Sequence, residues 1–166
     1  MVSRVSTGVP GLDELLAGGI PDGFNVLLSG APGTGKTILG LQFIHEGVKK
    51  GEPGCYVTFE QFKEEVMAQA EQFGWDAIRD ENLFSLLSIK KKNIQSFINY
   101  LSDEVDSKKV KRLVIDSLSV LAVYSNIIED PEQSSMSSLT VDLHSRTPLD
   151  MKQLRRTRQS TILWAR

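Results

Sequence analysis

The sequence predicts an α/β fold, in which a mostly parallel central sheet carries helices on both faces. Two observations lead to this prediction. Short apolar runs alternate along the chain with longer amphipathic segments, and the short runs are apolar at almost every position. A strand without polar alternation is buried on both sides, which is typical of a parallel sheet covered by helices. With 166 residues, 40% of them hydrophobic and 24% charged, the chain is long enough for one domain with a sizeable core.

The first half of the chain alternates strand and helix. Residues 26–29 form a short apolar run that breaks into a glycine-rich turn, so we expect a buried strand there. Apolar residues recur at helical spacing over 37–50, and this helix is expected to end at Gly51. Residues 54–59 are rich in β-forming side chains and predict a second strand. Another helix is expected over 63–73, closed by the glycine that follows it.

The second half continues the alternation. Residues 83–88 are a third possible strand, and 113–116 form an apolar run that ends on a carboxylate, Asp116. Between them, apolar residues are spaced by three, one, three and four positions, which predicts an amphipathic helix. These residues are Ile94, Phe97, Ile98, Leu101 and Val105. One more short strand is possible at 161–164.

Composition excludes several classes of protein. Nineteen Lys and Arg against 21 Asp and Glu leave a net charge of −2, which argues against a general nucleic-acid coat. Cys55 is the one cysteine, so no disulfide can form within the chain, and a cytoplasmic location is the simplest expectation. No apolar run approaches the ~20 residues that a membrane span needs, and the first residues lack the apolar stretch of a secretion signal.

Residues 30–37 match the phosphate-binding motif G-x-x-x-x-G-K-[ST] in full. Its glycines allow successive backbone N–H groups to point into one concavity, and the positive end of the following helix favours an anion there. We therefore expect ATP and Mg²⁺ as ligands, with Lys36 on the terminal phosphates and Thr37 as a magnesium ligand. The expected nucleotide-binding residues are Gly30, Ala31, Pro32, Gly33, Thr34, Gly35, Lys36 and Thr37.

Two carboxylates follow predicted strands and are candidates for chemistry. Asp116 ends its strand where open parallel sheets place ligand-facing residues, and it is expected to hold the magnesium together with Thr37. The alternative is that Asp116 only caps the turn that follows. Glu60 comes directly after the second predicted strand and is the catalytic candidate, because it could polarise a water near the γ-phosphate. The alternative is a solvated acid in a loop.

Several segments resemble the KaiC-like branch of the RecA superfamily. The phosphate loop is preceded by residues 6–21, which read Ser-Thr-Gly-Val-Pro-Gly-Leu-Asp-Glu-Leu-Leu-Ala-Gly-Gly-Ile-Pro. It is followed by Gly-Glu-Pro-Gly-Cys-Tyr-Val-Thr-Phe-Glu at 51–60, Phe-Gly-Trp-Asp at 73–76 and Val-Ile-Asp-Ser at 114–117. The resemblance covers about residues 3–130. It implies a RecA-like P-loop core, Mg-ATP binding, and assembly into a homo-oligomeric ring, hexameric in one option, with nucleotide between subunits. A Glu-Glu pair commonly follows the second strand in that family, and its first member is the base; here the pair reads Glu60-Gln61.

The end of the chain departs from that resemblance. We therefore expect a KaiC-like ATP-binding domain at 1–133 and a divergent or incomplete segment at 134–166. Residues 146–166 carry six basic residues against one acidic residue, a local charge of +5. Two interpretations are open: a version of the family's next helix and strand, or a shifted reading frame or truncated gene product. Loss of a basic residue that reaches the γ-phosphate would slow turnover by ~10³–10⁵-fold.

The leading interpretation is an Mg-ATP-binding and ATP-hydrolysing regulatory ATPase of KaiC type. One alternative is a nucleotide-sensing module with negligible turnover, and another is a recombinase-like DNA-dependent ATPase. We expect no membrane partner, and we expect the basic runs at 90–92 and 108–112 to be solvated faces rather than nucleic-acid sites. His45 is expected on a helix surface, Cys55 in the core, and Trp75 against the sheet.

Overall fold

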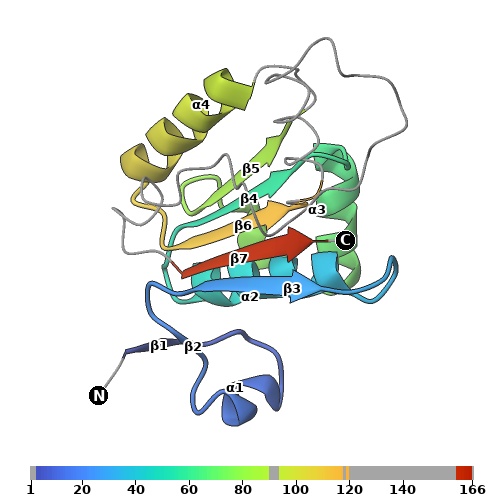
Figure 1. Cartoon of the computed structure of the whole chain (residues 1–166), viewed down its shortest axis with the longest axis vertical. Coiled ribbons are helices and arrows are strands. Elements are labelled where there is room, and N and C mark those ends of the chain that lie inside the picture. The colour runs from blue at the N-terminus through green and yellow to red at the C-terminus, as the bar shows by residue number, and fades with distance from the viewer. Residues whose placement is uncertain (1–2, 90–93, 118, 120–159, 166) are drawn as a thin grey trace, which may run out of the picture.

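Among the described residues, five strands form one parallel sheet (Figure 1). The structure is a computed structural model, and it describes residues 3–89, 94–117, 119 and 160–165. The order across the sheet is β3-β7-β6-β4-β5, and every neighbouring pair is parallel, which confirms the predicted architecture. The strands are β3 (Asn25–Ser29), β4 (Gly54–Thr58), β5 (Phe84–Ser88), β6 (Arg112–Asp116) and β7 (Ser160–Ala165).

Helices cover both faces of the sheet, as the alternation of segments predicts. α2 (Lys36–Lys49), α3 (Lys63–Gln72) and the short 3₁₀ helix η1 (Asp76–Arg79) contribute residues to an apolar cluster on one face. α4 (Ile94–Ser107) contributes to a second cluster on the opposite face (Figure 1). In the part of the chain described here, no helix combines the length and apolar character that crossing a bilayer requires.

The strand β4 shows how the two clusters are separated. All five of its residues are buried, which explains why its sequence lacks polar alternation. Tyr56 points toward the α2 side, whereas Cys55 and Val57 belong to the cluster on the α4 side. β6 follows the same pattern with Val114 on the α2 side. Both central strands therefore pack on two faces, and their carboxyl ends are held in register.

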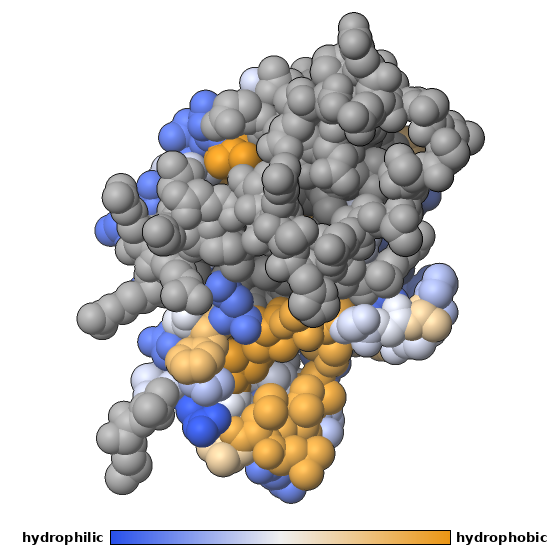
Figure 2. Space-filling model, viewed as in Figure 1, coloured by the Kyte–Doolittle hydropathy of each residue, from blue (hydrophilic) through white to orange (hydrophobic). Residues whose placement is uncertain are grey.

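A small N-terminal unit precedes the sheet and was not predicted. β1 (Arg4–Val5) pairs antiparallel with β2 (Ile20–Pro21), and α1 (Leu12–Leu15) lies between them in the chain. These elements are too short for hydrophobic periodicity to reveal them. Figure 2 shows apolar side chains gathered on this part of the surface. The exposed large apolar residues of this unit and of the strand that follows it are Leu15 and Leu16, Phe24 after β2, and Leu27 in β3.

The strand expected at 161–164 is present as β7, and it lies between β3 and β6. It therefore separates the strand that leads into the phosphate loop from the strand that ends on Asp116. The boundary expected at residue 133, the rest of the segment to residue 159, and Arg166 lie outside the described residues. The basic run at 90–92 also lies outside them.

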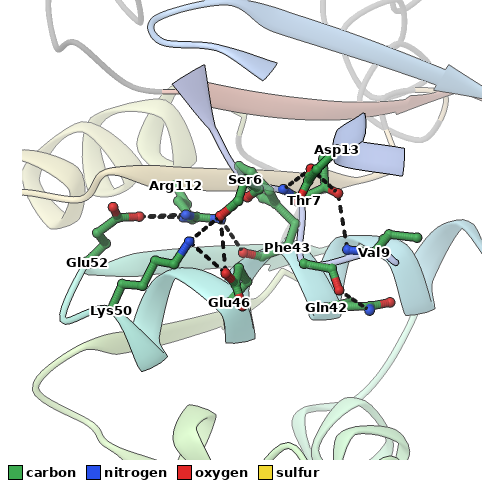
Figure 3. Close-up of polar contacts among 11 residues, drawn as sticks. Ser6, Thr7, Val9, Asp13, Gln42, Phe43, Glu46, Lys50, Glu52 and Arg112 are labelled. Atoms are coloured by element: carbon green, nitrogen blue, oxygen red, sulfur yellow. Dashed lines mark hydrogen bonds and ion pairs between the residues drawn. The ribbon is translucent and has the colours of Figure 1, made fainter. Parts of the chain in front are cut away.

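Arg112 corrects the expectation that residues 108–112 form a solvated basic face. Lys109 and Lys111 are exposed, but Arg112 is only 1% exposed. Its guanidinium donates to the carbonyls of Ser6 (2.7 Å) and Phe43 (2.9 Å) and pairs with Glu52 (2.7 Å), as Figure 3 shows. The sequence of this run, four basic residues around one valine, does not predict the burial of Arg112. That burial depends on the distant segments that pack against β6.

Arg112 also explains one glycine of α2. It lies 4.7 Å from the centre of the Phe43 ring, over its face. Gly47, on the next turn of the same helix, has no room for a Cβ atom, because the Arg112 side chain occupies that space. Arg112 thereby connects the start of β6, the middle of α2 and the N-terminal segment.

Candidate functional site

The phosphate loop joins β3 to α2. Gly33 and Gly35 have φ angles of +78° and +86°, a backbone conformation that favours glycine and allows the tight turn. The Lys36 ammonium donates to the carbonyls of Gly30 and Ala31, both at 2.8 Å. α2 begins at Lys36, so the loop ends on the N-terminus of a helix of 14 residues. This is the strand, glycine turn and helix arrangement that the motif requires to bind phosphate.

The carboxylate of Asp116 lies beside this loop. Thr37 Oγ1 donates to Asp116 Oδ2 at 2.8 Å, although the two residues are 79 positions apart. Tyr56, in the middle of β4, donates to the same oxygen, also at 2.8 Å. Burial, followed by the negative charge of Asp116, raises the pKa of the Tyr56 phenol well above its usual range. Asp116 is therefore anchored by two hydroxyl groups from two different elements.

Glu60 lies in the loop that follows β4. Ser117, the residue after Asp116, donates from Oγ to Glu60 Oε1 at 3.2 Å. Thr58 Oγ1 accepts from the backbone N–H groups of Glu60 (3.3 Å) and Gln61 (3.1 Å), and Ser88 donates to the Gln61 carbonyl (2.8 Å). These contacts fix the loop at the carboxyl edge of the sheet. Gln61 Oε1 is buried and has no hydrogen-bond partner within the described part of the chain.

Most of the predicted site residues line one cavity of about 270 Å³, whereas Gly30, Ala31 and Thr34 of the phosphate loop do not line it. It contains the phosphate loop, the end of β6 and the loop after β4, so the structure brings Lys36, Asp116 and Glu60 together. The lining residues are Pro32, Gly33, Gly35, Lys36, Thr37, Ile38, Glu60, Gln61, Asp116 and Ser117. Hydroxyl and carboxylate oxygens are the donors that Mg²⁺ prefers, and a lysine beside a glycine loop suits phosphate oxygens. The residues present therefore fit a magnesium-bound nucleotide.

Comparison with known proteins agrees with this arrangement. The family described as "ATPase: KaiC" matches this chain over residues 5–130. The chain belongs to the KaiC family of ATPases. The match includes the phosphate loop, the loop after β4 and the end of β6, so every element that lines the cavity lies inside the KaiC-family region.

Relatives of this KaiC-family chain include proteins that are longer than it is. A UPF0273 protein of Pyrococcus furiosus is 40% identical over 142 aligned positions, which cover 74% of this chain and 58% of the relative. A UPF0273 protein of Thermotoga maritima is 39% identical, with 74% and 59% covered. The chain thus spans less than two thirds of the length of these curated relatives.

A solved structure confirms the predicted fold. The crystal structure of a KaiC-like protein from Pyrococcus horikoshii matches with a TM-score of 0.78 and 32% sequence identity. The match covers 99% of this chain and 71% of that protein. Both the predicted resemblance to KaiC and the predicted RecA-like α/β fold are therefore confirmed.

Trp75 packs in line with its prediction, whereas His45 is less exposed than expected. Trp75 packs against the apolar cluster on the α2 side, and its ring stacks on that of Phe73, with 4.8 Å between the ring centres. His45 is half-buried rather than on an open helix surface, because its ring stacks on that of Trp75, with 5.9 Å between the ring centres. Burial is the main reason that the pKa of His45 lies below its usual value.

Cys55 is a core residue of this KaiC-family domain, as predicted, and its burial has a measurable consequence. Burial raises the pKa of its thiol to about 12, from an ordinary value of 9.0 in an open chain. We expect a thiol reagent at about pH 8 to label the native protein only as fast as it unfolds. Between pH 9 and about 12 the unfolded thiol loses its proton first, so the free energy of unfolding should fall as pH rises.

Urea unfolding at a series of pH values checks this expectation, with Cys55→Ala as the control. The wild type should lose stability more steeply than the variant above about pH 9 and run parallel to it below that pH. Rapid labelling of the native protein would contradict the burial of the thiol.

Proposed function

We propose that this chain binds Mg-ATP in the cavity beside the phosphate loop and hydrolyses it, as a regulatory ATPase of KaiC type. The observation that carries the proposal is the hydrogen bond from Thr37 to Asp116, at 2.8 Å. It joins the first turn of the helix after the phosphate loop to the carboxyl end of β6. A hydroxyl and a carboxylate held together at this point are what a nucleotide-bound magnesium ion needs.

Each residue of the cavity has a proposed role. Lys36 and the backbone amides of the loop hold the phosphates, and the flexible stem of the lysine allows its ammonium to turn from the loop carbonyls to a phosphate oxygen. Thr37 and Asp116 hold Mg²⁺, directly or through water. The ion would neutralise charge on the phosphates. Glu60 accepts a proton from the attacking water and orients it.

The electrostatics support the participation of both Lys36 and the metal. A helix N-terminus stabilises an anion by only ~0.3–2 kcal/mol, whereas micromolar binding requires about 8 kcal/mol. The loop backbone alone is therefore insufficient. We expect the Lys36 ammonium and a bound divalent ion to supply the rest of the binding free energy, because both would act in a cavity that is partly closed to water.

Assembly, location and domain boundaries belong to the same proposal. We propose a homo-oligomeric ring, hexameric or of another size, in the cytoplasm. The ATP-binding domain would occupy 1–133, with 134–166 as a divergent or incomplete segment that adds β7 to the same sheet. Family membership supports the ring, and the exposed apolar side chains around Phe24 and Leu27 support self-association. Because Arg112 is buried, the run at 108–112 offers nucleic acid less charge than its sequence suggests, which weighs against a DNA-dependent ATPase.

Lys36→Ala is expected to weaken Mg-ATP binding by about 10- to 100-fold, since it removes a charge-assisted contact to phosphate. Isothermal titration of the wild type and the variant measures this effect. The matched control is Lys49→Ala, an exposed lysine at the other end of α2, which should bind Mg-ATP like the wild type. Equal affinities for wild type and Lys36→Ala, or no binding to either, would contradict the proposal.

A nucleotide sensor with negligible turnover is the second candidate. Gln61 favours it, because this residue stands where the family commonly has a second glutamate, and its side-chain oxygen lies buried in the cavity wall without a partner among the described residues. An amide at this position cannot accept a proton from water. Single-turnover hydrolysis separates the sensor from the ATPase.

A further inference from the structure

Tyr56 contacts the proposed metal ligand Asp116 from the buried side of the site. Its side chain is fully buried in the apolar cluster on the α2 side, which includes Leu41 and Val114. The one polar atom of that side chain donates to Asp116 Oδ2 at 2.8 Å. Tyr56 lies inside the segment 51–60 that resembles the KaiC family, but neither that resemblance nor the strand pattern predicts a role for its hydroxyl.

The register of the sheet explains how Tyr56 reaches Asp116. Thr58 is the residue of β4 that pairs with Asp116 on β6, and Tyr56 lies two positions before it. Two residues of a strand span about 6.6 Å, which a tyrosine ring and its hydroxyl can cross. A valine, leucine or phenylalanine at this position could fill the apolar cluster but could not reach the carboxylate with a donor.

The two hydrogen bonds to Asp116 converge on one oxygen. Thr37 and Tyr56 both donate to Oδ2, and Oδ1 accepts no hydrogen bond from the described residues. A rotation of the carboxylate would break both bonds at once. Thr37 is itself a proposed magnesium ligand, whereas Tyr56 is enclosed by the core and supports Asp116 from the protein side.

We infer that Tyr56 is a positioning residue, whose hydroxyl holds the Asp116 carboxylate in the orientation in which it binds magnesium. The inference rests on the proposed Mg-ATP binding. It predicts that the Tyr56 hydroxyl contributes to metal affinity and not to the affinity for the nucleotide itself.

Tyr56→Phe tests the inference, since it removes one oxygen and keeps the ring. ATP binding is measured by titration at increasing Mg²⁺ and again with the metal chelated. We expect the Mg²⁺ concentration for half-maximal enhancement of ATP binding to rise about tenfold, equivalent to about 1.4 kcal/mol, with metal-free binding unchanged. Tyr100→Phe is the matched control, because Tyr100 is an exposed tyrosine on α4 and its variant should behave like the wild type.

A double-mutant cycle makes the test independent of any general loss of stability. In the Asp116→Asn background, Tyr56→Phe should have no additional effect on the Mg²⁺ requirement, because the two residues act through one contact. An unchanged Mg²⁺ requirement in Tyr56→Phe, an equal loss of metal-free and metal-dependent binding, or full additivity in the cycle would each overturn the inference. A wild type that binds no Mg-ATP would overturn the proposed function and the inference with it. The two failures are distinguishable, because the first is seen in the wild type and the second in Tyr56→Phe.

Discussion

Glu60→Gln is expected to slow single-turnover ATP hydrolysis by about 10²–10⁴-fold and to leave Mg-ATP affinity nearly unchanged. The amide has the size of the carboxylate and can still take part in hydrogen bonds, but it cannot accept the proton of the attacking water. Glu60 is exposed at the cavity, and its carboxylate accepts a hydrogen bond from Ser117. Rapid-quench measurement of phosphate release with enzyme in excess over ATP isolates the chemical step from product release.

Glu64→Gln is the control for this experiment. Glu64 is an exposed glutamate in the first turn of α3, four residues from Glu60, so its substitution changes the local charge equally without touching the cavity. The control should retain the wild-type rate. If the wild type is already as slow as Glu60→Gln while both bind Mg-ATP, the nucleotide sensor is the correct function.

Arg112→Met is expected to lower the free energy of unfolding by about 3–5 kcal/mol. The guanidinium is almost fully buried and donates to the carbonyls of Ser6 and Phe43, which would both lose this donor in the core. The Glu52 side chain is 39% exposed, so water compensates for part of the broken ion pair, and most of the loss comes from the two carbonyls. Urea unfolding followed by tryptophan fluorescence measures the effect as a shift of the midpoint.

Lys111→Met provides the comparison for Arg112. The two residues are adjacent and both are basic, but Lys111 is exposed, so its substitution should change stability by less than about 0.5 kcal/mol. Similar losses in both variants would mean that Arg112 does not connect β6 to α2 and the N-terminal segment in solution.

Most of the sheet and the phosphate loop could be predicted because their signals are local. A run that lacks the polar alternation of a half-buried strand, such as 54–59, identifies a strand buried on both faces without any knowledge of its neighbours. The phosphate loop is also contiguous, so one segment contains both its glycine turn and the lysine that it presents. The N-terminal β1–β2 pair escaped prediction because two-residue strands carry no periodicity.

Residues whose roles depend on distant partners could not be predicted in the same way. The sequence identified Asp116 and Thr37 separately, and the expectation that they meet came from the general behaviour of parallel sheets. The order of strands, with β7 between β3 and β6, follows from no local pattern. It depends on which strands form backbone hydrogen bonds with one another, and these strands are far apart in the sequence.

The alternation of strands and helices, the phosphate loop and the positions of Asp116 at the end of one strand and Glu60 just after another could all be read from the sequence, because each depends on a few consecutive residues. The roles of Tyr56 as a donor to Asp116 and of Arg112 as a buried connection to Ser6, 106 residues away, became visible in the folded chain alone. In both cases the same side chain would be an ordinary core or surface residue with other neighbours. Packing between distant segments sets burial and hydrogen-bond partners, and these give the two side chains their roles.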